Sequence, residues 1–197
     1  MPVLNCDVEQ AREQLVAAGV EVTAGNTDHE RWRASYEGAT AVAYDDKVVL
    51  QGSDPGRLEA LLSEGGGRAH VYFDGACRGN PGEAAVGYVI VTDGGIVTEG
   101  GERVGRMTNN AAEYEALLKA LELAAEYGFE EVEIRGDSEL IVKQVRGEYD
   151  TNDPDLREYR IRVRELLTEF SEWSISHVPR DINERADKLA NEAFEDG

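Results

Sequence analysis

Cysteine is scarce in this chain, because Cys6 and Cys77 are the only two among 197 residues. They form no Cys-x-x-Cys pair and have no histidine pair beside them, so the sequence predicts neither a disulfide framework nor a zinc site. Long apolar runs are lacking as well, and the first residues do not show the pattern of a signal peptide. We therefore expect a soluble, cytoplasmic protein without a membrane partner.

Basic residues are also few, since Lys and Arg total 20 against 40 Asp and Glu, for a formal net charge of −20. The acidic residues are spread over most predicted helices and turns instead of forming one tail. Such a surface disfavours a polyanionic partner in dilute buffer. Molar salt, however, shortens the Debye length to roughly 3 Å and screens the repulsion. The composition resembles that of proteins from salt-loving organisms; the alternative is a surface kept acidic for solubility alone.

A glycine-rich stretch divides the chain, and we predict a linker over residues 64–68. Before it, residues 1–63 are expected to form a small α+β domain with a helix over 8–18, a hairpin over 39–51 and a helix over 55–62. After it, residues 69–197 show three strands in a meander and then helices alternating with strands. This order predicts a mixed five-stranded α/β sheet flanked by helices.

Four carboxylates occupy corresponding places in the second domain. Asp74 and Asp137 each follow a short apolar strand pattern, whereas Glu113 and Asp187 lie in the first turns of predicted helices. Strand ends and helix N-termini meet at one edge of an open α/β sheet, where ligands bind. Carboxylates gathered there would repel one another unless cations lay between them, and hard divalent metals are suitable cations. The sequence therefore predicts a metal site at this edge.

The stretches around these carboxylates resemble the motif set of the type 1 ribonuclease H (ribonuclease HI) family, in a halophilic archaeal form with an extra N-terminal domain. Each stretch alone is weak, but their order and their coverage of nearly all of residues 68–197 are specific. The alternative is that these acids are only helix caps and surface charge. The stretches are Asp74 to Gly82, Thr108 to Glu113, Gly136-Asp137-Ser138, and His177 to Asp187.

This resemblance implies an endoribonuclease that cleaves the RNA strand of RNA/DNA hybrids and leaves a 5′-phosphate and a 3′-hydroxyl. It implies two Mg²⁺ ions, with Mn²⁺ as a substitute, about 3.5 to 4 Å apart. Asp74 would bridge both ions, Glu113 and Asp137 would hold one, and Asp187 would hold the other. His177 would serve in proton transfer or product release. No protein partner is implied, and we expect a monomer.

The resemblance also implies a set of substrate contacts. Backbone and amide side chains would meet the RNA strand, where the 2′-hydroxyl distinguishes RNA from DNA. Arg106 and Thr108 resemble a pocket for a phosphate of the DNA strand, although an ordinary turn before a helix would explain them too. The residues expected to contact RNA are Gly75, Ala76, Cys77, Asn80, Asn109 and Asn110.

The chain departs from many family members in two places. An acidic segment, residues 147–155, stands where a basic, tryptophan-rich protrusion is common, and Glu139 replaces a neutral residue. Both changes weaken the electrostatic attraction for nucleic acid. Two other functions therefore stay open: a binding module of the same fold that does not cleave, and an exonuclease of the wider superfamily.

The N-terminal segment offers a weaker resemblance. Trp32 and the two strand patterns of residues 41–52 loosely resemble the small TATA-binding-protein-like module of type 3 ribonucleases H. This implies an accessory domain that helps to grip nucleic acid. The alternative is a stability or interaction domain whose partner is unknown.

Overall fold

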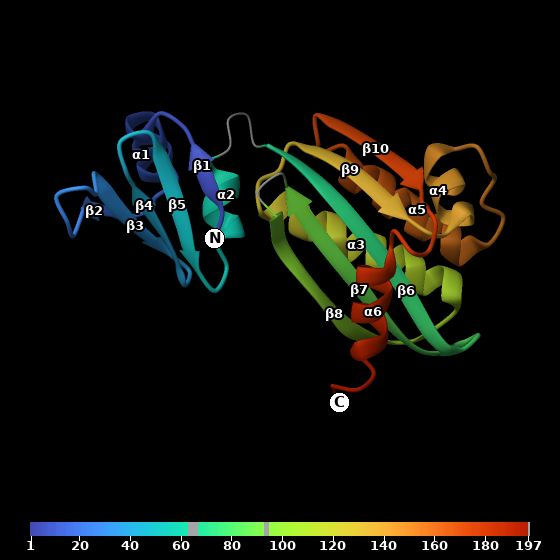
Figure 1. Ribbon diagram of the computed structural model, residues 1–197. Coiled ribbons are helices and arrows are strands. Elements are labelled where there is room, and N and C mark those ends of the chain that lie inside the picture. Colours follow the sequence, from blue (N-terminus) through green and yellow to red (C-terminus); the bar gives the residue numbers. More distant parts are fainter. Residues whose placement is uncertain (63–66, 93–94, 197) are drawn as a thin grey trace. The chain divides into compact units, whose positions relative to one another are not determined.

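The computed structural model describes residues 1–62, 67–92 and 95–196 (Figure 1). The chain separates into two compact units, one of residues 1–67 with 91–98, and one of residues 68–90 with 99–197. Each unit contains one five-stranded sheet. Residues 64–66 of the predicted linker lie outside the described residues, and Arg68 already belongs to a strand. Among the helices that the structure describes, none combines the length and apolarity needed to cross a membrane.

The first unit is an antiparallel sheet in the order β1-β5-β4-β3-β2 with two helices. The predicted hairpin and both helices are present, which confirms the α+β class; the short strands β1, β2 and β3 were not predicted. Asp7 caps α1 by accepting hydrogen bonds from the amides of Glu9 and Gln10. The elements are β1 (Val3–Asn5), α1 (Val8–Ala17), β2 (Val22–Ala24), β3 (Trp32–Tyr36), β4 (Ala39–Ala43), β5 (Lys47–Gly52) and α2 (Gly56–Leu62).

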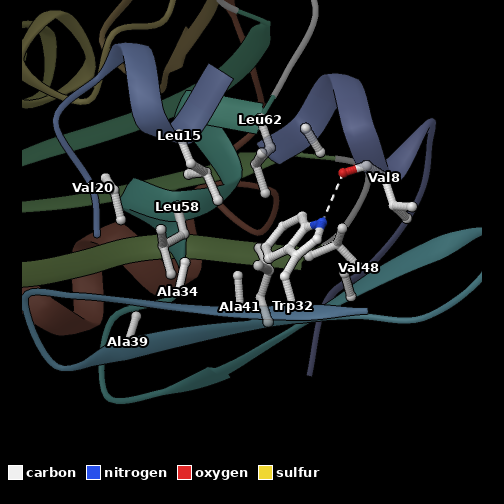
Figure 2. Packing of buried hydrophobic residues seen from close by; sticks show 13 residues of the cluster. Val8, Leu15, Val20, Trp32, Ala34, Ala39, Ala41, Val48, Leu58 and Leu62 are labelled. Carbon is white, nitrogen blue, oxygen red and sulfur yellow. Dashed lines mark hydrogen bonds between the residues drawn. The ribbon is translucent and has the colours of Figure 1, made fainter. Parts of the chain in front are cut away.

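A buried tryptophan organises the core of this unit (Figure 2). Trp32 is 2% exposed, and its indole Nε1 donates a 2.8 Å hydrogen bond to the carbonyl oxygen of Val8 at the start of α1. Leu15 from α1 and Leu58 from α2 are fully buried in the same cluster. The indole thus joins sheet and helix while its only polar atom is satisfied.

The second unit is the predicted mixed five-stranded sheet, in the order β10-β9-β6-β7-β8. β6 runs parallel to β9, and β9 runs parallel to β10. Helices α3, α4 and α5 lie on one face of this sheet and α6 lies on the other (Figure 1). The elements are β6 (Arg68–Gly79), β7 (Gly82–Thr92), β8 (Gly95–Met107), α3 (Asn109–Glu126), β9 (Glu131–Gly136), α4 (Glu139–Arg146), α5 (Pro154–Leu167), β10 (Glu172–His177) and α6 (Glu184–Glu192).

Side-chain caps set where two helices of this unit begin. The hydroxyl of Thr108 accepts a hydrogen bond from the amide of Ala111 at the start of α3, and that of Ser138 accepts one from Ile141 at the start of α4. Such caps satisfy amides that have no partner within the helix. Ser138 directly follows Asp137, and Thr108 lies five residues before Glu113. Each cap therefore fixes the start of a helix close to a predicted carboxylate.

One local expectation was wrong. Asp74 lies inside β6, which continues to Gly79, and not at the end of a strand. The parallel ladder with β9 ends at the pair of Tyr72 with Arg135, and β6 then continues as the first arm of the hairpin with β7. Asp74 therefore lies where its strand has lost one neighbour, which leaves room for a ligand beside the backbone.

Candidate active site

Three of the predicted carboxylates converge. Asp74 in β6, Glu113 in α3 and Asp137 after β9 each offer an oxygen atom, and these atoms lie within 4.8 Å of one another. Asp74 is only 4% exposed. Hard oxygen donors in this number and spacing suit a divalent cation such as Mg²⁺ or Mn²⁺. The arrangement of the residues thus fits the metal that the sequence predicted.

A glycine permits this convergence by letting β6 and α3 approach closely. A Cβ atom at Gly75 would lie 2.3 Å from the carbonyl carbon of Ala112 and 2.4 Å from the amide nitrogen of Glu113, nearer than atoms can pack. The Gly75 amide donates a 3.3 Å hydrogen bond to Glu113 Oε2. The residue after Asp74 therefore both admits the helix and orients its carboxylate.

Burial and mutual repulsion raise the pKa of two carboxyl groups of this cluster, Asp74 and Glu113. For Asp74, burial raises the pKa most, and the charges of Glu113, Asp137 and Asp187 raise it further. For Glu113, burial again raises the pKa most and Asp137 adds to it, while the Gly75 amide acts in the opposite direction. A bound cation would oppose these effects by neutralising the charges.

The fourth carboxylate, Asp187 in α6, lies in the same cavity but outside the group of three. This cavity of about 440 Å³ is also lined by Arg180 and Asn191. Arg180 forms a 3.5 Å ion pair with Asp187, and the Asn191 amide donates to Asp187 at 3.3 Å. Sequence reasoning assigned no role to Arg180 or Asn191. Asn191 lies four residues after Asp187, and this spacing on a helix predicts that the two side chains contact each other.

His177 ends β10 at the exposed edge of the site. Its Nε2 lies 3.2 Å from the backbone carbonyl oxygen of Asp137, within hydrogen-bond distance. The imidazole is not among the residues that line the carboxylate cavity. The structure thus brings His177 beside Asp137, but the contact is with the backbone of Asp137 and not with its carboxylate.

The predicted substrate residues fall into two places. Asn109 lines the carboxylate cavity, as do the consecutive residues 75–77 of β6. Asn80 accepts a 3.1 Å hydrogen bond from the Asn109 amide. Arg106 and Thr108 instead line a second cavity of about 470 Å³. Asn110 is half-buried and lines neither of them.

Comparisons with known proteins agree with this arrangement. A family model described as "Reverse transcriptase-like" matches residues 72–193. Ribonuclease HI of Halobacterium salinarum is 59% identical over 198 residues, which cover all of both chains. The crystal structure of RNase H1 from the same archaeon is 66% identical with a TM-score of 0.66, covering 66% of this chain and all of that one. LC11-RNase H1, solved with an RNA/DNA hybrid, is 41% identical with a TM-score of 0.62, over 65% of this chain and 97% of that one.

The mixed sheet with a carboxylate cluster at Asp74 defines a metal-dependent nuclease of the ribonuclease H fold. Within that class, the chain belongs to the ribonuclease HI family, since its similarity to one member extends from end to end. It is therefore an enzyme that hydrolyses phosphodiesters.

Proposed function

We propose that this enzyme hydrolyses the RNA strand of RNA/DNA hybrids internally and leaves a 5′-phosphate and a 3′-hydroxyl. The observation that carries the proposal is the convergence of Asp74, Glu113 and Asp137 within 4.8 Å. The similarity to LC11-RNase H1, which was solved with such a hybrid, supports the substrate. An intact set of carboxylates disfavours a module that only binds.

The four carboxylates divide naturally between two Mg²⁺ ions, with Mn²⁺ as the substitute. Glu113 and Asp137 would hold one ion, Asp187 would hold the other, and the central, most buried Asp74 would contact both. Held by these residues, the ions would supply the charge needed to activate a water molecule and to stabilise the departing 3′ oxygen. His177 is exposed at the edge of the site, so its imidazole is suited to carry a proton between the site and solvent.

Substrate recognition would use the two cavities separately. The main chain of residues 75–77, with Asn109, lines the cavity of the carboxylates and is suited to meet the cut strand and its 2′-hydroxyls. Asn80 supports Asn109 through its hydrogen bond, and Asn110 follows in the first turn of α3. Arg106 and Thr108 in the other cavity would take a phosphate of the uncut DNA strand.

The direct test is Asp74→Asn, which keeps the shape of the side chain and removes its charge. We expect cleavage of a labelled hybrid with Mg²⁺ or Mn²⁺ to be lost while the fold is kept. Asp150→Asn, at an exposed aspartate outside both cavities, is the matched control and should cleave normally. Near-normal turnover by Asp74→Asn would refute the metal assignment.

Two further assays separate the alternative functions. A hybrid with both ends blocked can be cut only by an endonuclease, so its survival would favour the exonuclease. Binding without cleavage by the wild type, at several salt concentrations and with several metals, would favour the non-catalytic module.

We also propose that residues 1–63 form an accessory domain that contacts the nucleic acid through one face of their sheet. Strand alternation places Arg33, Thr40, Lys47 and Gln51 on the face opposite the core side chains, and no residue of β1 to β5 is acidic. Arg33 pairs with Glu30 at 3.1 Å, so Lys47, which is exposed, is the basic side chain of this face that would meet a polyanion. In a chain of net charge −20, such a face is suited to a polyanion. Lys47→Glu should raise KM for the hybrid, whereas Arg12→Glu, at an exposed position on α1, should not. Equal KM values for the two variants would contradict this.

A further inference from the structure

The cavity of about 470 Å³ that contains Arg106 and Thr108 has a second wall that the proposed function leaves unused. That wall is helix α5, which contributes both polar and apolar side chains. On it lie Asp153, Asp155, Leu156, Glu158, Tyr159 and Arg162. Arg106 and Thr108 on one wall are proposed to bind a phosphate, so the side chains of the α5 wall would lie close to the same strand.

Arg162 differs from the other arginines of α5. Arg157, Arg160 and Arg164 each donate a hydrogen bond to a backbone carbonyl, at 3.1, 2.7 and 2.8 Å. These arginines hold the α4–α5 region together. Within the described part of the chain, Arg162 forms no hydrogen bond or ion pair, and its guanidinium carbon lies 5.7 Å from the centroid of the Tyr159 ring. Arg162 is exposed, so its donors are available to an anion.

Arg106 on the opposite wall is also without a carboxylate partner in the described residues. Its one hydrogen bond there goes from Nη2 to the carbonyl oxygen of Pro81, at 3.4 Å. Arg106 and Arg162 therefore present two guanidinium groups to one cavity. Guanidinium groups bind phosphates in a bidentate geometry, so each of the two is suited to a phosphate of a nucleic-acid backbone.

The carboxylates on the α5 wall determine which kind of anion the cavity can bind. Asp153 caps α5 by accepting hydrogen bonds from the amides of Asp155 and Leu156. Asp155 and Glu158 are exposed and unfavourable for a small anion that arrives alone. A strand already held at the metal site overcomes this repulsion through its high local concentration. The cavity therefore favours a nucleic-acid backbone over free phosphate.

Tyr159 provides a fixed surface in the same cavity as the two guanidinium groups. Its ring is stacked on that of Tyr114, with centroids 5.8 Å apart and an interplanar angle of 13°. Its hydroxyl donates a 3.3 Å hydrogen bond to Glu115 Oε1. A ring held in this way can pack against a sugar with little loss of conformational entropy on binding.

We propose that Tyr159 and Arg162 form the second half of the site for the uncut strand. Arg106 and Thr108 bind one phosphate, Arg162 binds the adjacent phosphate, and the Tyr159 ring packs against the deoxyribose between them. This assignment rests on the proposed function, because it takes the hybrid as the substrate. It gives α5 a direct part in binding even though the segment before it is acidic.

The test is Arg162→Gln in the full-length enzyme, with hybrid cleavage and hybrid binding in Ca²⁺ both measured. We expect KM and Kd to rise about tenfold, as for loss of one charge-assisted contact, while kcat changes far less. The plot of log Kd against log salt should lose about one unit of slope, because one phosphate contact is gone. Arg146→Gln, at an exposed arginine on α4 outside this cavity, is the matched control.

Single uncharged methylphosphonate linkages then identify the strand. In the wild type, two adjacent linkages of the DNA strand should each weaken binding, and Arg162→Gln should be insensitive to one of them. Unchanged KM and salt slope in Arg162→Gln, or sensitivity confined to the RNA strand, would overturn the assignment. In both cases the wild type would still cleave the hybrid. The assignment of Arg162 can therefore be wrong while the proposed function is right.

Discussion

Asn183 and Phe73 are 110 residues apart in sequence, yet the Asn183 Nδ2 donates a buried 2.9 Å hydrogen bond to the Phe73 carbonyl oxygen. Asn183 precedes α6, which carries Asp187, and Phe73 precedes Asp74 in β6. This one bond therefore joins the strand of the central carboxylate to the helix of the fourth. Asn183 is 1% exposed, so water cannot replace the bond.

We predict that Asn183→Ala destabilises the fold by about 1 to 3 kcal/mol, because the Phe73 carbonyl would be left buried without its donor. Metal affinity should fall as well, since α6 would no longer be fixed against β6. Urea denaturation and Mn²⁺ titration measure the two effects. Asn152→Ala, at an exposed position, should change neither. Loss of stability with unchanged Mn²⁺ affinity would show that the bond is only structural.

Gly75→Ala should impair both stability and cleavage. The added methyl group would overlap the backbone of α3 at Ala112 and Glu113, and overpacking of this kind costs about 1 to 3 kcal/mol. Moving α3 away displaces Glu113 from the other carboxylates. Gly128→Ala is the control, because a Cβ there meets nothing within 4 Å and only its positive φ of 84° is strained. If Gly75→Ala cleaved normally, close approach of β6 and α3 would not be required.

The metal-free enzyme should lose stability as the pH rises. The raised pKa of Asp74 and of Glu113 means that each binds its proton more tightly in the folded protein than in the unfolded chain, where the pKa is about 4. Their contribution is thus largest below about pH 4 and declines as the pH rises towards the raised values. With EDTA in molar KCl, wild type should lose more stability between about pH 5 and about pH 8 than Asp74→Asn. Identical pH slopes would contradict this.

Added metal should reverse the effect. Mg²⁺ or Mn²⁺ binds the carboxylates in the folded protein only, so wild type should gain stability with metal concentration. Asp74→Asn, without its central ligand, should gain much less. Equal stabilisation of both proteins would place the bound metal elsewhere.

Salt should stabilise the fold, because a net charge of −20 is screened as the ionic strength rises. We expect the native far-UV circular dichroism signal and the urea midpoint to increase from dilute buffer to molar KCl. Sucrose at equal osmolality controls for effects of the solvent other than screening. If the protein were fully stable in dilute buffer, screening of its acidic surface would not contribute to stability, and the prediction would be wrong.

Several features could be predicted from local sequence. The order of strands and helices after residue 68 follows from apolar periodicity, and Thr108 and Ser138 mark the starts of α3 and α4 because their side chains cap adjacent amides. The carboxylates Asp74, Glu113 and Asp137 were identified by the motifs around them. These signals depend on residues within a few positions of one another.

Only the tertiary structure decided how distant residues meet. It placed Asp74 inside a strand, because the ladder with β9 ends at Tyr72. It separated Asp187 from the group of three and left Arg162 facing the cavity of Arg106. The amino-acid sequence by itself determined the chemistry of the carboxylates and the order of the elements, since both depend on local patterns. Which side chains share a cavity depended on the packing of β6, α3, α5 and α6, and no local pattern encodes such long-range contacts.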